Sequence, residues 1–272
     1  MANGGEHLGA VVRRYETAGE YFARYLLDHH LGGREPQLWR GVGDALLASA
    51  RAEDWIDAFR QMASLQLCRR LIDAGAVLLT RYGIDAAERE VKQMIVDTMV
   101  VHYRAAGAVY ERLIPAVNSS LTTINDSVRK ELRAFARREM PYCYLCGADM
   151  DFEAKTHLSF TLDHVWPRAY GGDSSLENLL GACQSCNNHK SDTPSWALYP
   201  VQALVAGFEI ESTEELQKDM RFATQARAAT TLVHDLDISL REAFMQLGRP
   251  GFPAIDNINT AVDVFNLRFA NP

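Results

Sequence analysis

Four of the five cysteines in this 272-residue chain form two pairs, Cys143/Cys146 and Cys183/Cys186. Each pair has the spacing CxxC, which places two thiols on one turn of the backbone. Two such turns brought together can hold a metal ion in a closed tetrahedral site of four thiolates, the usual arrangement for structural Zn²⁺. Because 36 residues separate Cys146 from Cys183, we expect the zinc to join the two ends of an inserted hairpin, so that metal binding is part of folding.

Polar residues that could act on a substrate lie within and just after this insertion. Asp163 and His164 are adjacent, Asn178 follows, and Asn187 comes directly after the second cysteine pair. Apolar and polar residues alternate from position 155 to 164, which predicts a half-buried strand. A second strand is expected near Asn178, and the run CQSCNNHK predicts a knuckle that leads into a short helix. The local unit is therefore expected to be β-loop-β-α.

The run DHVWPRAYGG…ENL…CQSCNNHK resembles the HNH endonucleases, a family of ββα-metal nucleases. The resemblance covers about fifty residues and says nothing about residues 1–130 or 200–272. It implies that His164 is the general base that takes a proton from the attacking water. It also implies that Asp163 and Asn187 bind a catalytic metal and that Asn178 orients the His164 loop or ring.

The last letter of the motif is Asn187 here rather than a histidine, as in the HNN versions of the family. A carboxylate and an amide oxygen as ligands favour Mg²⁺ or Mn²⁺ over a second Zn²⁺. Arg168 and Lys190 flank the motif where family members often contact phosphate. A solvated surface role for either residue is equally compatible with the sequence.

A basic helix is predicted immediately before Cys143, with Arg129, Arg133 and Arg137 spaced four residues apart. Residues 143–200 are acidic, with three Lys and Arg against seven Asp and Glu. Because cationic contacts to phosphates supply most nonspecific affinity for nucleic acid, we expect this helix or a partner to provide the grip. The alternative is an ordinary solvated helix face.

The rest of the chain is expected to be helical, so the fold class is mainly α, with helical regions flanking a small zinc-clamped ββα-metal module. We expect a helical domain over residues 1–120, a basic connecting helix over 121–140, the HNH module over 141–193 and a helical region over 194–272. The remaining cysteine, Cys68, is expected to be a small apolar residue at a helix interface. Apolar spacing predicts helices at about 8–30, 36–49, 53–82, 85–114, 194–206, 212–247 and 256–269.

Two functions compete at this level. The first is a metal-dependent endonuclease that hydrolyses DNA, with RNA not excluded; the second is a non-catalytic, zinc-stabilised adaptor that binds nucleic acid or protein. The helical flanks suit a protein partner or a homo-oligomer, and analogy at the level of the fold suggests the effector of an antiphage defence complex. The sequence has no signal peptide and no run of about eighteen apolar residues, so we expect a cytoplasmic protein without a membrane segment.

Overall fold

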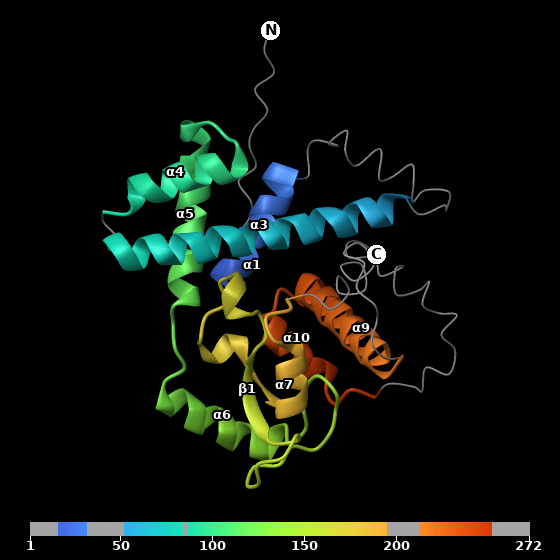
Figure 1. Cartoon of the computed structure of the whole chain (residues 1–272). Helices are drawn as coiled ribbons and strands as arrows, with labels where there is room; N and C mark the ends of the chain where they lie inside the picture. Colours follow the sequence, from blue (N-terminus) through green and yellow to red (C-terminus); the bar gives the residue numbers. More distant parts are fainter. Residues whose placement is uncertain (1–15, 32–51, 84–85, 195–212, 252–272) are drawn as a thin grey trace.

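The computed structural model describes residues 16–31, 52–83, 86–194 and 213–251 (Figure 1). The described part is mainly α-helical with one two-stranded sheet, which confirms the predicted fold class. The helices are α1 (Ala18–Leu26), α3 (Ala52–Tyr82), α4 (Glu88–Met99), α5 (Tyr103–Ser120), α6 (Asp126–Glu139), α7 (Gln184–Lys190), α9 (Thr213–Leu236) and α10 (Leu240–Leu247). The strands are β1 (Phe160–His164) and β2 (Leu179–Cys183), and the short turns are η1 (Leu27–Leu31), η2 (Arg168–Tyr170) and η3 (Leu176–Asn178).

Side-chain caps explain where two of these helices begin. The Thr17 hydroxyl accepts from Glu20 N at 3.2 Å and Glu20 Oε2 accepts from Thr17 N at 2.8 Å, a capping box that starts α1. Asn125 Oδ1 accepts from Val128 N at 2.9 Å and starts α6. These caps satisfy backbone N–H groups that have no partner inside the helix.

The single helix predicted over residues 85–114 is wrong. It is two helices, because Val100 adopts a left-handed conformation (φ 53°) that ends α4, and α5 begins after His102. Contrary to expectation, Pro115 does not end α5, which continues to Ser120.

The helix predicted over residues 212–247 is also divided. Asp237 is left-handed (φ 51°), and the Ser239 hydroxyl caps the start of α10. The helix predicted over 53–82 is confirmed by α3. Those predicted over 36–49, 194–206 and 256–269 fall wholly or almost wholly outside the described residues.

Two hydrophobic cores organise the described residues. The first, which we call the helical core, lies among α1, α3, α4 and α5 and includes Phe22, Leu71, Ile95 and Leu113, together with Cys68, whose predicted burial is confirmed. The second, the cysteine core, contains Cys143, Cys146, Cys183 and Cys186 together with residues of α6, β2, α9 and α10. The loop after β1 joins the two, because Trp166, Ala169 and Tyr170 pack into the helical core. The segment between the two cysteine pairs therefore packs against α6, α9 and α10 in the cysteine core and, through the loop after β1, against the helical core (Figure 1).

A close backbone contact fixes α1 against this loop. Gly19 N donates to Gly171 O at 3.1 Å. A Cβ atom on Gly19 would lie 1.9 Å from Tyr170 O, so only glycine permits this approach. Gly171 itself has a left-handed φ of 80°. The first described helix therefore touches the loop that follows His164.

None of the helices among the described residues combines the length and the apolar character needed to cross a bilayer.

Candidate active site and metal centre

The structure brings the four predicted zinc cysteines together. The Sγ atoms of Cys143, Cys146, Cys183 and Cys186 all lie within 4.8 Å of one another. A tetrahedral zinc site with Zn–S bonds of about 2.3 Å places its sulfur atoms about 3.8 Å apart. The measured separation between Cys146 and Cys183 is 4.0 Å. The donor set and its spacing therefore fit a structural Zn²⁺.

Hydrogen bonds among these thiols shift the pKa of each of them. Contacts with the neighbouring sulfurs raise the pKa of Cys143 and Cys186 and lower the pKa of Cys146 to about 7. Four thiolates at this distance would repel one another strongly without a cation between them. Because three of the four residues are buried, a divalent metal is the group that best satisfies the cluster.

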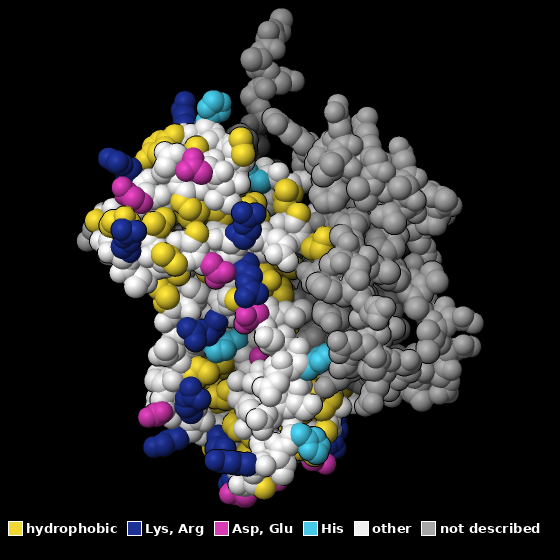
Figure 2. Space-filling model, in the orientation of Figure 1, with side chains coloured by type: hydrophobic (Ala, Val, Ile, Leu, Met, Phe, Trp, Pro, Cys, Tyr) yellow, Lys and Arg dark blue, Asp and Glu magenta, His cyan; other side chains and the backbone are white. Residues whose placement is uncertain are grey.

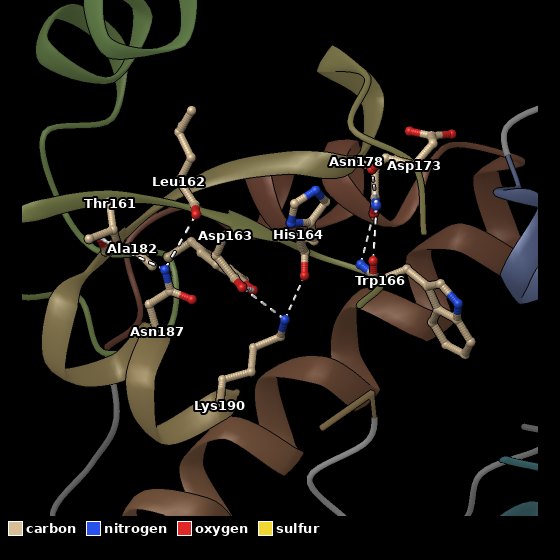
Figure 3. A network of polar contacts seen from close by, with 11 residues as sticks. Thr161, Leu162, Asp163, His164, Trp166, Asp173, Asn178, Ala182, Asn187 and Lys190 are labelled. Atoms are coloured by element: carbon tan, nitrogen blue, oxygen red, sulfur yellow. Dashed lines mark hydrogen bonds and ion pairs between the residues drawn. The ribbon is translucent and has the colours of Figure 1, made fainter. Parts of the chain in front are cut away.

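The candidate catalytic residues lie on the antiparallel hairpin between the two cysteine pairs. Asp163 pairs with Leu180 and His164 with Leu179 in the β1–β2 register. Successive side chains of a strand point to opposite faces. Asp163 therefore faces α7, while the ring of His164 points away from it (Figure 3).

Asp163 is 4% exposed and is held by a buried network. Lys190 Nζ, from α7, lies 3.1 Å from Asp163 Oδ1 and 3.0 Å from Oδ2, and it also donates to the His164 carbonyl (Figure 3). The Tyr144 hydroxyl donates to Asp163 Oδ2. Burial raises the pKa of Asp163, and the Lys190 charge and the Tyr144 hydrogen bond oppose that rise. Sequence reasoning missed Tyr144, because an aromatic residue inside a CxxC turn carries no periodic signal.

This network alters two predictions. Lys190 is 3% exposed, so its ammonium group does not reach a phosphate at the surface in this conformation, contrary to expectation. The Asp163 carboxylate has the hard oxygen chemistry of a Mg²⁺ ligand, but both of its oxygens already have partners. A cation at Asp163 would have to replace the Lys190 ammonium group.

Asn187 offers a better-placed oxygen. Its Nδ2 donates to Thr161 Oγ1 at 3.0 Å and to Leu162 O at 3.3 Å, which fixes the amide orientation against β1. Its Oδ1 has no hydrogen-bond partner within the described ranges. An oriented amide oxygen of this kind suits a hard cation that keeps several water ligands.

His164 is half-buried, and its Nε2 lies 3.0 Å from the hydroxyl of Ser174. Burial, reinforced by the charges of Arg168 and Lys190, lowers the pKa of His164 to about 4 from 6.5. The imidazole is therefore neutral at pH 7 and able to accept a proton. As pH falls from 6.5 towards 4 the unfolded chain protonates first, so this group removes stability in that window.

Asn178 is 3% exposed and pins the loop that follows His164. Its Oδ1 accepts from Trp166 N at 2.8 Å, and its Nδ2 donates to Trp166 O at 2.9 Å and to Asp173 O at 2.8 Å. Gly172 makes room for this, since a Cβ there would lie 1.9 Å from Trp166 O. The loop therefore closes around the Asn178 amide.

Arg168 reaches the helical region rather than open solvent. Its Nε and Nη2 donate to Ser120 O, at the end of α5, at 3.1 and 2.8 Å. Phosphate contact by Arg168 stays a prediction, but the guanidinium already joins the loop to α5.

The three predicted arginines of α6 are all exposed, and several Lys and Arg side chains lie at the surface in this part of the molecule (Figure 2). They differ in their partners. Arg133 donates to Phe152 O, and Arg137 pairs with Glu153, so both hold the turn before β1. Arg129 contributes to lowering the pKa of His164, so its charge acts on the candidate base, although less than the charges of Arg168 and Lys190. Of the three, Arg129 is the best placed for a phosphate near His164.

Replacing Lys190 by Met should destabilise the protein strongly. The substitution leaves the buried Asp163 carboxylate without its cation, which costs about 3–5 kcal/mol in comparable buried pairs. Urea unfolding followed by tryptophan fluorescence and circular dichroism measures the loss.

A matched control for this substitution is Lys130→Met, at an exposed position of α6, which should change stability little. The double variant Lys190→Met, Asp163→Asn should recover much of the loss, because it removes both charges together. Equal stability of Lys190→Met and wild type would contradict the buried pair.

Comparison with known proteins gives a match for one segment of the chain. No curated protein and no solved structure matches the chain. Residues 143–196, which contain all four cysteines and the hairpin, match the HNH endonuclease family, as the sequence motif predicts. This segment of the chain is therefore an HNH endonuclease domain.

Proposed function

We propose that this chain is a metal-dependent endonuclease that hydrolyses phosphodiester bonds of DNA, with His164 as the general base. The observation that carries the proposal is the neutral, anchored imidazole of His164 within an HNH domain, one residue from Asp163 on the hairpin that α7 covers. A general base must be held in a fixed orientation to take a proton from water, and the contact between His164 Nε2 and Ser174 supports this role.

The other residues would position the reactants. Asn178 holds the loop after His164 closed, and Asn187 presents an amide oxygen whose orientation is fixed by Thr161 and Leu162. Asn187 and Asp163 would hold Mg²⁺ or Mn²⁺, with Lys190 moving away from the carboxylate. The metal, when bound, would supply Lewis-acid stabilisation of charge on the scissile phosphate and the leaving oxygen.

Incubation of the full chain with DNA tests the function directly. Zinc-loaded protein is mixed with supercoiled plasmid, linear duplex, single-stranded DNA and RNA, each with Mg²⁺, Mn²⁺ or EDTA. We expect cleavage of DNA that needs the added metal. If every substrate stays intact with every metal, the nuclease proposal is wrong.

Of the three arginines of α6, Arg129 is the one whose charge acts on His164, and it would supply part of the affinity for DNA. Replacing Arg129 by Glu should weaken DNA binding at all sequences and reduce the slope of log affinity against log salt by about one. Arg129 is preferred to Arg133 and Arg137, because those two also hold Phe152 and Glu153 in place. Fluorescence anisotropy at several salt concentrations measures both quantities.

Arg138→Glu is the matched control for this substitution. It makes the same change of charge on α6, but the Arg138 side chain pairs with Glu139 and is 74% exposed. If both variants weaken binding equally, only the overall charge matters and Arg129 has no special place.

One observation favours a second function, a non-catalytic adaptor stabilised by zinc. Asp163, a proposed metal ligand, is already neutralised by Lys190 in the interior. In that case the domain would bind nucleic acid or protein without cutting. The two functions separate on one measurement, since DNA binding without cleavage in any metal supports the adaptor.

The helical regions would bind a protein partner or a second copy of the chain. Apolar side chains that suit such contacts are exposed on this part of the molecule, among them Val77 at 65% and Tyr103 at 51%. A role as the effector of an antiphage complex rests on analogy of fold alone. The division of the chain into domains at residues 120, 140 and 193 is also a proposal. Trp166, from the module over residues 141–193, packs into the helical core of the domain before it.

A further inference from the structure

The ring of His164 is tied to the helical region through Ser174. His164 Nε2 lies 3.0 Å from Ser174 Oγ, and Ser174 Oγ lies 3.2 Å from the carbonyl oxygen of Thr122. Ser174 N also donates to Thr122 Oγ1 at 3.0 Å. Thr122 belongs to the connection between α5 and α6, so a residue outside the HNH domain completes this chain of contacts.

Counting hydrogens along these contacts determines which ring nitrogen carries the proton. A carbonyl oxygen only accepts, and a serine hydroxyl has one hydrogen to donate. The hydrogen of Ser174 must therefore point to Thr122 O, since the alternative leaves two oxygens facing each other at 3.2 Å with no hydrogen between them. Ser174 Oγ then accepts from His164, which requires a proton on Nε2.

We infer that Thr122 and Ser174 hold His164 as the Nε2–H tautomer and leave the lone pair on Nδ1. Ser174 is then a positioning residue, and Nδ1 is the atom that accepts the proton of the attacking water. That last role rests on the proposed nuclease function, whereas the tautomer does not.

The surroundings of Ser174 keep the arrangement rigid. Ser174 is 8% exposed, and Asn178 Nδ2 donates to the carbonyl of Asp173, the residue before it. On the other side, Arg168 donates to Ser120 O, two residues before Thr122. The connection after α5 and the loop after His164 are therefore joined at two places, of which the contact between Ser174 and Thr122 sets the tautomer of the candidate base.

Nitrogen NMR of the zinc-loaded full chain tests the inference without any activity measurement. The protein is labelled with ¹⁵N at its eight histidines, and spectra are recorded above neutral pH, where imidazoles are uncharged. The His164 signals are identified by their loss in His164→Gln. We expect Nε2 to give the protonated type of shift and Nδ1 the unprotonated type.

Ser174→Ala should convert this single form into a mixture of tautomers. Ser175→Ala is the matched control, since its hydroxyl contacts Asp173 in the same loop and not His164, so its His164 signals should equal those of wild type. In cleavage assays Ser174→Ala should lower kcat about 10-fold with KM unchanged, and Ser174→Thr, which keeps the hydroxyl, should restore part of it.

Two results would overturn the inference. The first is a wild-type His164 that carries its proton on Nδ1, a result that needs no folded Ser174 variant. The second is a folded Ser174→Ala protein with unchanged His164 signals. If the tautomer is as inferred and responds to Ser174→Ala while no substrate is cut, the inference stands and the nuclease proposal fails.

Discussion

Replacing Cys183 by Ser is expected to abolish zinc binding and to unfold the region around the four cysteines. Cys183 ends β2, and its Sγ accepts from Cys186 N at the start of α7. A structural Zn²⁺ contributes about 10–16 kcal/mol to the folding of small zinc domains, more than the total stability of many domains. Loss of one thiolate should therefore remove both the metal and the cysteine core.

Elemental analysis and near-ultraviolet circular dichroism check this result. Wild type should contain one zinc per chain, and Cys183→Ser less than one tenth of that amount. The matched control is Cys68→Ala, which removes the cysteine of the helical core and should keep the zinc. A Cys183→Ser protein with full zinc content and an unchanged spectrum would exclude the cluster as the metal site.

The second large effect is expected from His164→Ala, which should abolish cleavage while preserving the fold and the zinc. Loss of a general base costs about 10²–10⁴-fold in rate. Among the residues that the structure describes, the ring has one side-chain hydrogen bond, to Ser174, and that hydroxyl keeps the carbonyl of Thr122 as its partner. The substitution therefore removes the base without leaving a buried polar group alone.

Single-turnover cleavage rates, measured with the protein in excess over DNA, give the effect on chemistry. His157→Ala is the control, because that side chain is exposed on the same hairpin unit and should leave the rate unchanged. Cleavage by His164→Ala at the wild-type rate would show that the base lies elsewhere.

The cysteine cluster and the hairpin could be predicted from the sequence because their signals are local. The spacing of two CxxC pairs favours a shared metal site, and the alternation before His164 predicts a strand from the local sequence alone. The contacts that position the side chains of His164 and Asp163 join residues far apart in the sequence. Ser174 meets Thr122 across 52 residues of chain, and Tyr144 meets Asp163 across 19.

Lys190 shows why such contacts escape prediction. Lysine side chains are usually exposed to solvent. From its place beside the motif, Lys190 is therefore expected either to contact a phosphate or to be solvated. Only the folded packing of α7 against β1 places its ammonium group on a buried carboxylate. The predicted helix boundaries are wrong because Val100 and Asp237 adopt left-handed conformations, which the spacing of apolar residues does not reveal and which a β-branched residue such as Val100 rarely adopts.

The glycine contact between α1 and the loop after β1 limits how this HNH domain can be expressed as a separate fragment or moved into another protein. Gly19 N and Gly171 O meet directly, and no side chain lies between them to yield. A fragment that begins at residue 141 would lose this contact together with Thr122 and Ser120, and its loop after His164 would face solvent on the side now covered. The boundaries of the family motif are therefore narrower than those of the smallest fragment that preserves this loop.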